Sequence, residues 1–185
     1  DLGQGSRTRP SDPFGYWEAR YGEAEGIWSG NVNQALADSI ADRTAGTALD
    51  LGAGEGGDSL WLAQRGWQVT AVDLSPTALA RGEAAASRAG MGEAITWIAA
   101  DLESCASEKS YDLVSACFLH SRVRLDRSSI LRRASEWVAP GGLLLVVGHA
   151  EPPPWAKHAD DPMDRPTPAE DLALLGLGKN WTTLI

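Results

Sequence analysis

The stretch Ala48–Gly57, ALDLGAGEGG, joins a short apolar strand to a glycine-rich loop, and a helix is expected to follow at residues 58–65. Glycines allow a tight turn and a close approach of the backbone to a ligand. The first N–H groups of the following helix are unpaired donors in a partly positive field. The sequence therefore predicts a ligand-binding turn between a buried strand and a helix.

Short apolar runs alternate with helical patterns on both sides of this turn, which is typical of βα units stacked into a parallel sheet. Strands are expected at residues 48–51, 68–72, 95–99, 111–117 and 143–147, and the beginning of another at 181–185. Helices are expected at residues 31–41, 58–65, 76–89, 128–138 and 169–175. Ser75 is a natural N-cap and Pro76 suits the first helical position. Residues 140–142, Pro-Gly-Gly, are expected to form a turn, and the proline-rich residues 152–168 a long loop.

Length and composition restrict the class of protein. A chain of 185 residues with 43% hydrophobic and 22% charged residues fits one globular domain. No apolar run approaches the roughly 20 residues that span a membrane. The formal net charge of -9 is a poor electrostatic match to nucleic acid or to an anionic membrane. Two cysteines without metal-ligand spacing, Cys105 and Cys117, fit a reducing compartment, so we expect a cytoplasmic protein without a metal site.

Three acids at strand ends strengthen the glycine signal. The G-x-G-x-x-G spacing at residues 52–57 matches the dinucleotide-binding fingerprint, which is weak evidence when taken alone. Asp73 can accept both hydroxyls of a ribose, and Asp101 can accept the exocyclic amine of an adenine. Asp50 lies inside the first strand, which is usually apolar in dinucleotide oxidoreductases, so it argues for a ligand with a cationic part. Open α/β sheets bind ligands beyond the carboxyl ends of their strands, where these acids fall.

Five stretches follow one another in a characteristic order: ALDLGAGEGGDSL (48–60), VTAVDLSPTAL (69–79), AADL (99–102), YDLVSACFLH (111–120) and APGGLLLVV (139–147). This series resembles the ordered motifs of class I S-adenosylmethionine-dependent methyltransferases. The resemblance implies an α/β fold with one doubly wound, Rossmann-like, mostly parallel sheet. YWEARYGEAEGIWSGNVN (16–33) is similar to the cap of small bacterial methyltransferases of the tellurite-resistance and thiopurine-methyltransferase-like groups.

The resemblance also implies how S-adenosylmethionine, whose product form is S-adenosylhomocysteine, is held. Asp50 would reach its amino group and Asp73 its ribose, while Leu74 would pack on the adenine. Asp101 and Leu102 would address the adenine edge. The remaining contacts implied are Gly52, Ala53 and Gly54 along the methionine and ribose, Cys117 at the methionine end, Arg20 at the carboxylate and Trp28 over the pocket.

One structural domain in two parts is expected from this resemblance. Residues 1–41 would form an N-terminal arm with an aromatic cap helix, and residues 42–185 the Rossmann-like cofactor-binding part. The family's sheet normally ends with a sixth strand and an antiparallel seventh. This sequence stops where the sixth would begin, so we expect the last strands to be missing from it.

Several side chains have structural alternatives to a role at the site. Asp50 and Asp101 can cap nearby backbone amides, Asp73 can cap its strand end, and Cys117 can be an ordinary buried thiol. Tryptophans in apolar patterns are interpreted as core or edge packing: Trp61, Trp67, Trp97 and Trp137. A set of arginines is interpreted as a solvated helix face: Arg122, Arg124, Arg127, Arg132 and Arg133.

His120 and His149 follow the fourth and fifth expected strands, and both would open on the ligand side. A base with a pKa near neutrality could deprotonate a methyl acceptor there, and the alternative for each is a hydrogen-bonded surface histidine. Methyl transfer from a sulfonium needs no protein nucleophile, because the enzyme holds two reactants aligned and excludes water.

The leading hypothesis is a methyltransferase acting on a small molecule, as a monomer or homodimer, with no nucleic-acid or membrane partner. An NAD(P)-dependent oxidoreductase and a non-catalytic S-adenosylmethionine-binding protein are the alternatives. A nucleic-acid methyltransferase is disfavoured by the acidic charge.

Overall fold

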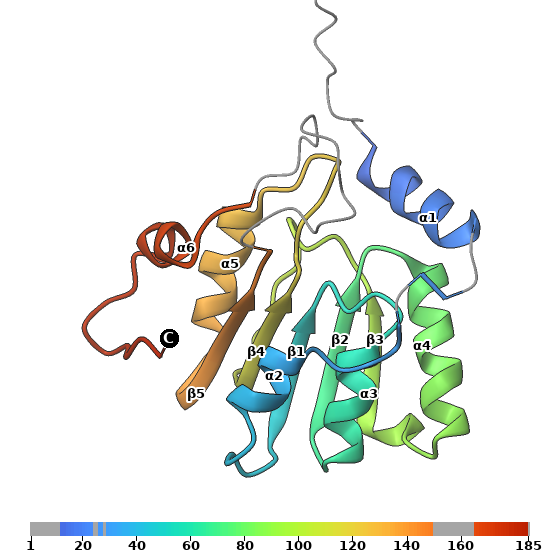
Figure 1. Ribbon diagram of the computed structural model, residues 1–185, viewed down its shortest axis with the longest axis horizontal. Coiled ribbons are helices and arrows are strands. Elements are labelled where there is room, and N and C mark those ends of the chain that lie inside the picture. Colours follow the sequence, from blue (N-terminus) through green and yellow to red (C-terminus); the bar gives the residue numbers. More distant parts are fainter. Residues whose placement is uncertain (1–11, 24–25, 28, 150–164, 185) are drawn as a thin grey trace, which may run out of the picture.

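The computed structural model describes residues 12–23, 26–27, 29–149 and 165–184. Its strands form one parallel sheet with the order β3-β2-β1-β4-β5 (Figure 1). The strands are β1 Thr47–Leu51, β2 Gln68–Asp73, β3 Ile95–Ala99, β4 Tyr111–Cys117 and β5 Val138–Val147. The helices are α1 Pro13–Glu23, α2 Gln34–Ser39, α3 Gly57–Gln64, α4 Pro76–Arg88, α5 Arg127–Glu136 and α6 Pro168–Leu175, with a 3-10 turn at Gly92–Ala94.

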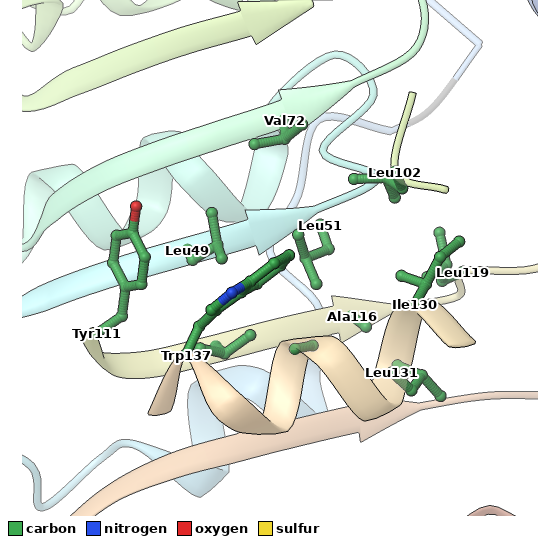
Figure 2. Packing of buried hydrophobic residues seen from close by; sticks show 12 residues of the cluster. Leu49, Leu51, Val72, Leu102, Tyr111, Ala116, Leu119, Ile130, Leu131 and Trp137 are labelled. Atoms are coloured by element: carbon green, nitrogen blue, oxygen red, sulfur yellow. The ribbon is translucent and has the colours of Figure 1, made fainter. Parts of the chain in front are cut away.

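Helices cover both faces of the sheet, because successive side chains of a strand point to opposite faces. On one face Leu51 of β1 joins a cluster with Ile130 of α5 and the indole of Trp137, which lies against the strands in Figure 2. On the other face Ala48 of β1 packs with Leu62 of α3, in a cluster that α2 and α4 also enter. The expected doubly wound α/β fold is confirmed.

Local signals fixed most element bounds. The bounds expected for β3 and β4 are confirmed, while β1 and β2 are each one residue longer than expected. The α4 helix begins as expected: Ala78 N–H donates to the Ser75 hydroxyl (3.1 Å), and Pro76 is the first helical residue. Gly90, at φ +72°, follows its C-cap in the left-handed conformation that favours glycine.

The expected turn at residues 140–142 is wrong, because β5 already begins at Val138. Val138 pairs with Tyr111 and Leu143 pairs with Leu113, so β5 accommodates three extra residues in an irregularity of the ladder. Pro140 lies within this irregular part of an outer strand, where a missing N–H is tolerated. The Pro-Gly-Gly sequence therefore marks a bulge and not the connection before a strand.

The interpretation of the arginines as a solvated face is confirmed for the exposed Arg122, Arg124 and Arg132 and is wrong for Arg127 and Arg133, which are partly buried. Arg127 forms a two-pronged ion pair with Asp171 of α6, and Arg132 donates to the Leu174 carbonyl (2.9 Å). Arg133 donates to the carbonyl of Leu102 (2.7 Å). The acceptors come from segments 31 to 44 residues away in sequence, which helical spacing alone does not reveal.

The two ends of the described chain differ from expectation. The α1 helix covers part of the aromatic segment, whereas a helix was expected only at 31–41, where α2 is shorter. Residues 181–184 form no strand, so that expectation is wrong as far as the structure describes it. Residues 1–11 and most of the proline-rich segment lie outside the described residues. No helix in the described part combines the length and apolar character required to cross a bilayer.

Candidate functional site

The carboxyl ends of β1, β2 and β4 meet at one edge of the sheet. In the parallel register Asp50 of β1 lies between Ala71 of β2 and Ser115 of β4. Asp73 ends β2 and Cys117 ends β4. Side chains far apart in sequence are therefore brought to the place where open α/β sheets bind ligands.

The glycine loop is anchored to the end of β2. Gly52 N–H and Ala53 N–H donate to the Val72 carbonyl (2.8 and 3.0 Å), and Gly54 N–H donates to Asp73 Oδ2 (2.8 Å). Gly52 has φ +75°, and a Cβ placed there would come within 2.9 Å of Leu119 Cδ1. The left-handed backbone conformation favours glycine at this position, and a side chain there would also displace the end of Leu119.

Asp73 is held from both sides but keeps acceptor capacity. Its Oδ2 accepts from Gly54 N–H, and its Oδ1 accepts from Ser75 N–H (2.9 Å). Burial raises the pKa of its carboxyl, while these amide hydrogen bonds act in the opposite direction. Each carboxylate oxygen carries a second lone pair, so hydroxyl donors of a ribose fit beside the loop.

Asp50 is buried, with only 3% of its surface exposed. The Ser59 hydroxyl donates to its Oδ2 (2.6 Å), and the Ser115 hydroxyl lies 3.4 Å from its Oδ1. Burial first, and then the negative charge of Asp58, raise the pKa of Asp50 to about 7. The described residues that hydrogen-bond to Asp50 are serines and the charges that act on it are negative, so a positively charged ligand group suits the site.

Asp58 belongs to the site and was missed by the sequence reasoning. It lies in the first turn of α3, and its Oδ1 accepts from Asn33 N–H (2.6 Å). The Cys117 thiol donates to its carboxylate, and burial raises the pKa of both groups, so Cys117 is a thiol and not a thiolate. The one local signal for Asp58 is its place in the first turn of α3, where a negative charge is favourable. Within the described residues, no group of three or more acids, histidines or cysteines is arranged to hold a metal ion.

The adenine side is reached through β3. Ala100 N–H donates to the Asp73 carbonyl (3.0 Å), which brings the exposed Asp101 next to the end of β2. Asp101 Oδ1 accepts from Glu103 N–H (2.8 Å), as in the structural alternative of a turn cap. Leu102 is buried in the cluster of Figure 2, and Leu74 is half-buried. Adenine contacts by these residues remain predictions.

Hydrogen bonds accepted by two residues of α1, Glu18 and Tyr21, attach this helix to α4 and its N-cap. The Glu18 carboxylate accepts from the Ser75 hydroxyl, from Thr77 N–H (3.1 Å) and from the Thr77 hydroxyl (2.8 Å). These bonds hold the pKa of Glu18 below its ordinary value. Arg81 of α4 donates to the Tyr21 carbonyl (2.6 Å) and pairs with Glu55 of the glycine loop (2.8 Å).

These anchors were not expected from the sequence. Of the two residues expected in this segment, Arg20 is exposed on α1, and Trp28 lies outside the described residues. Their roles stay predictions.

The ends of β4 and β5 carry a group of rings. Phe118 and His149 are stacked with ring centroids 4.3 Å apart, and the rings of His149 and His120 are 6.1 Å apart. The backbone N–H of His149 donates to the ring nitrogen Nε2 of His120 (3.3 Å). Burial, together with Arg165, lowers the pKa of His149. The two histidines thus lie close together beyond the carboxyl ends of β4 and β5, and their role in a reaction stays a prediction.

A family model described as a methyltransferase domain matches residues 48–142, which is half of the chain. This chain belongs to that family. The match runs from β1 into β5 and includes the glycine loop, Asp50 and Asp73. The expected class I methyltransferase fold agrees with it.

A curated relative and several solved structures are similar over somewhat more than half of the chain. The ribosomal RNA small subunit methyltransferase C of Alcanivorax borkumensis (strain ATCC 700651 / DSM 11573 / NCIMB 13689 / SK2) is 34% identical over 112 residues, which are 58% of this chain and 34% of that protein. The chain thus spans about a third of the length of that relative.

Coclaurine N-methyltransferase bound to N-methylheliamine and S-adenosylhomocysteine is 26% identical, with a TM-score of 0.53, over 60% of this chain and 34% of that one. The glycopeptide N-methyltransferase MtfA with S-adenosylhomocysteine is 27% identical, with a TM-score of 0.55, over 69% and 53%. TehB from Haemophilus influenzae, 23% identical with a TM-score of 0.58 over 63% and 41%, shows the shared fold.

Proposed function

We propose that this protein is an enzyme that transfers a methyl group from S-adenosylmethionine to a small-molecule acceptor. One observation carries the proposal: the glycine loop is bonded to Asp73 while the buried Asp50 lies on the adjacent strand end. The family and the structures solved with S-adenosylhomocysteine support this choice of methyl donor.

The residues present fit such a donor. Asp50 supplies a buried negative charge for its ammonium group, and the free lone pairs of Asp73 suit its ribose hydroxyls. Gly52, Ala53 and Gly54 allow the backbone to lie against the methionine and ribose. A nicotinamide cofactor has no comparable use for Asp50, which places the oxidoreductase alternative second.

The transfer is an in-line displacement. The bond between the methyl carbon and the sulfonium sulfur breaks as the acceptor's lone pair forms its bond to that carbon, and the electron pair stays on sulfur as a neutral thioether. The proton of a hydroxyl or amine acceptor leaves to a base or to water. The protein contributes by holding the reacting atoms roughly 3–3.5 Å apart and aligned.

His149 is the better candidate for that base. Its lowered pKa keeps the imidazole neutral near pH 7, so it can accept a proton. His120 Nε2 already accepts from the backbone N–H of His149, so His120 is better placed to hold the chain at His149 than to take a proton. We expect His149→Asn to lower turnover of a hydroxyl or amine acceptor by about 100-fold with unchanged donor affinity. A thiolate acceptor would be unaffected.

An RNA acceptor is the second candidate, because the curated relative is named for ribosomal RNA. The net charge of -9 favours a small molecule, since phosphate binding requires basic surface. We also propose a cytoplasmic protein, monomeric or homodimeric, in which residues 1–41 form an arm and cap over residues 42–185.

Calorimetric titration with S-adenosylhomocysteine tests the proposal, with NADH titrated in parallel. Binding of S-adenosylhomocysteine and none of NADH is expected. Absence of S-adenosylhomocysteine binding at millimolar concentration would overturn the proposal, and binding of NADH would favour the oxidoreductase. Donor binding without turnover on any acceptor would favour a non-catalytic binding protein.

A further inference from the structure

Phe118 lies in a tight turn directly after β4, beside the end of β5. Among the described residues, it is the non-glycine residue with a positive φ, +54°. Its N–H donates to the Val147 carbonyl at the end of β5 (2.8 Å), and its carbonyl accepts from His120 N–H (2.7 Å). The backbone is therefore fixed at the carboxyl ends of β4 and β5, which are neighbours in the sheet (Figure 1).

Neither the turn nor the hydrophobic core requires a phenylalanine at position 118. The left-handed region is unfavourable for a bulky residue, and glycine or asparagine would make the same turn more easily. The residue is also 43% exposed, so its ring is largely outside the hydrophobic core. An apolar ring held in an unfavourable conformation and left open to solvent is better explained by a ligand than by packing.

One side of the ring is supported by other rings. The imidazole of His149 stacks on it, with planes 20° apart, and His120 follows at 26° to His149. The backbone N–H of His149 donates to His120 Nε2, which ties the chain after β5 to the His120 side chain. His149 is therefore stacked with both neighbouring rings, and the partly exposed Phe118 is at one end of the series.

The position of this ring relates it to the donor site. Phe118 directly follows Cys117, whose thiol donates to Asp58. Asp58 and Asp73 both raise the pKa of Asp50, so these acids lie close enough to interact. The ring therefore directly adjoins the strand end whose thiol contacts the acids of the donor site.

We propose that the Phe118 ring is a stacking platform for the methyl acceptor, that the acceptor is an aromatic small molecule, and that its reacting atom projects past the edge of Phe118 toward the His149 imidazole stacked behind it. This inference rests on the proposed function and deepens it. Offset stacking on an exposed ring selects a flat π-system over a saturated molecule of the same size.

The test uses 2-naphthol and its saturated counterpart, decahydro-2-naphthol, which share size, hydroxyl group and charge. Both are titrated into the purified protein loaded with S-adenosylhomocysteine, with binding followed by ligand-observed NMR. We expect 2-naphthol to bind about tenfold more tightly. Phe118→Asn keeps the turn and removes the ring, so it should lose this preference while its thermal stability is equal or higher. Phe118→Trp should retain the preference.

Trp61→Leu is the matched control, because it removes a partly exposed ring on α3 that stacks on Arg65. It should leave the preference for 2-naphthol unchanged. A preference that survives in Phe118→Asn, or the absence of naphthol binding to the loaded protein, overturns the inference. The inference is also overturned if the protein binds a single-stranded RNA oligonucleotide and not naphthol, and if Phe118→Asn abolishes that RNA binding. Failure of the protein to bind S-adenosylhomocysteine would instead remove the proposed function.

Discussion

The ends of β1 and β2 and the ends of β4 and β5 lie on the same edge of the sheet but are built differently. At β1 and β2, carboxylates bond to backbone amides and hydroxyls, so the loop and the charges form one unit. At β4 and β5, stacked rings and a left-handed residue shape the edge. The β1–β2 side, which we call the donor side, is thus held by charged hydrogen bonds, whereas the β4–β5 side, where we propose the acceptor and which we call the acceptor side, is shaped by ring stacking.

The largest difference between the two sides is expected when Asp73 is replaced. Asp73→Ala removes the bonds to Gly54 and Ser75 as well as the acceptor for the ribose, so we expect S-adenosylhomocysteine affinity to fall about 100-fold, or about 3 kcal/mol. Calorimetry measures this, with urea unfolding for stability. Asp112→Ala is the matched control, because Asp112 accepts from Thr47 N–H (2.8 Å) and its hydroxyl (2.9 Å) at the opposite end of the strands. An equal loss of affinity in both variants would contradict the assignment.

Asp50 gives the donor side a pH dependence that the acceptor side should not share. A cationic ligand favours the ionised form of a carboxyl whose pKa is about 7, so S-adenosylhomocysteine affinity should fall by up to about tenfold per pH unit below 7. Calorimetry from pH 5.5 to 8.5 measures this dependence.

Without ligand the sign for stability is opposite. The folded pKa of Asp50 lies above its ordinary value of 3.8, so its contribution to stability is complete below about pH 4 and is lost as pH rises through about 7. Asp50→Asn should flatten both profiles. A variant with the wild-type pH dependence of affinity would show that another group is responsible.

The α6 helix is tied to α5, which packs against β4 in the core cluster. Arg127 of α5 pairs with Asp171, and both side chains are only 13% exposed. Asp171→Asn should lower the free energy of unfolding by about 1–2 kcal/mol and speed hydrogen exchange in α6, with donor affinity unchanged. Glu136→Gln, an exposed change on α5, is the control and should have no effect. A loss of donor affinity in Asp171→Asn would mean that the two sides are coupled.

The smallest effect is expected at α1, which contacts the donor side. Glu18→Gln removes the charge that accepts from Ser75 and Thr77, so α1 amides should exchange faster and S-adenosylhomocysteine affinity should fall about threefold. Glu23→Gln alters an exposed acid at the end of the same helix and serves as control. Unchanged exchange in Glu18→Gln would show that α1 is held by its buried Tyr21 instead.

Much of the donor side could be predicted because its signals are local. The glycine spacing, the Ser75–Pro76 helix start and the acid at the end of β2 each lie within a few residues of the element that they define. Asp58 escaped because its partners, Asn33 and Cys117, are distant in sequence. The β5 bulge escaped because Pro-Gly-Gly also favours a turn, and only pairing with β4 distinguishes the two.

By itself, the sequence determined the alternation of strands and helices, because backbone propensities, caps and apolar periodicity act over short distances. It also determined which acids end strands, and a parallel sheet then brings those ends together. Only the tertiary structure decided which groups meet across that edge. Glu18 of α1 contacts Thr77 of α4, the Cys117 thiol donates to Asp58, and Phe118 stacks with His149. Those contacts join segments whose separation carries no sequence signal, and packing alone selects them.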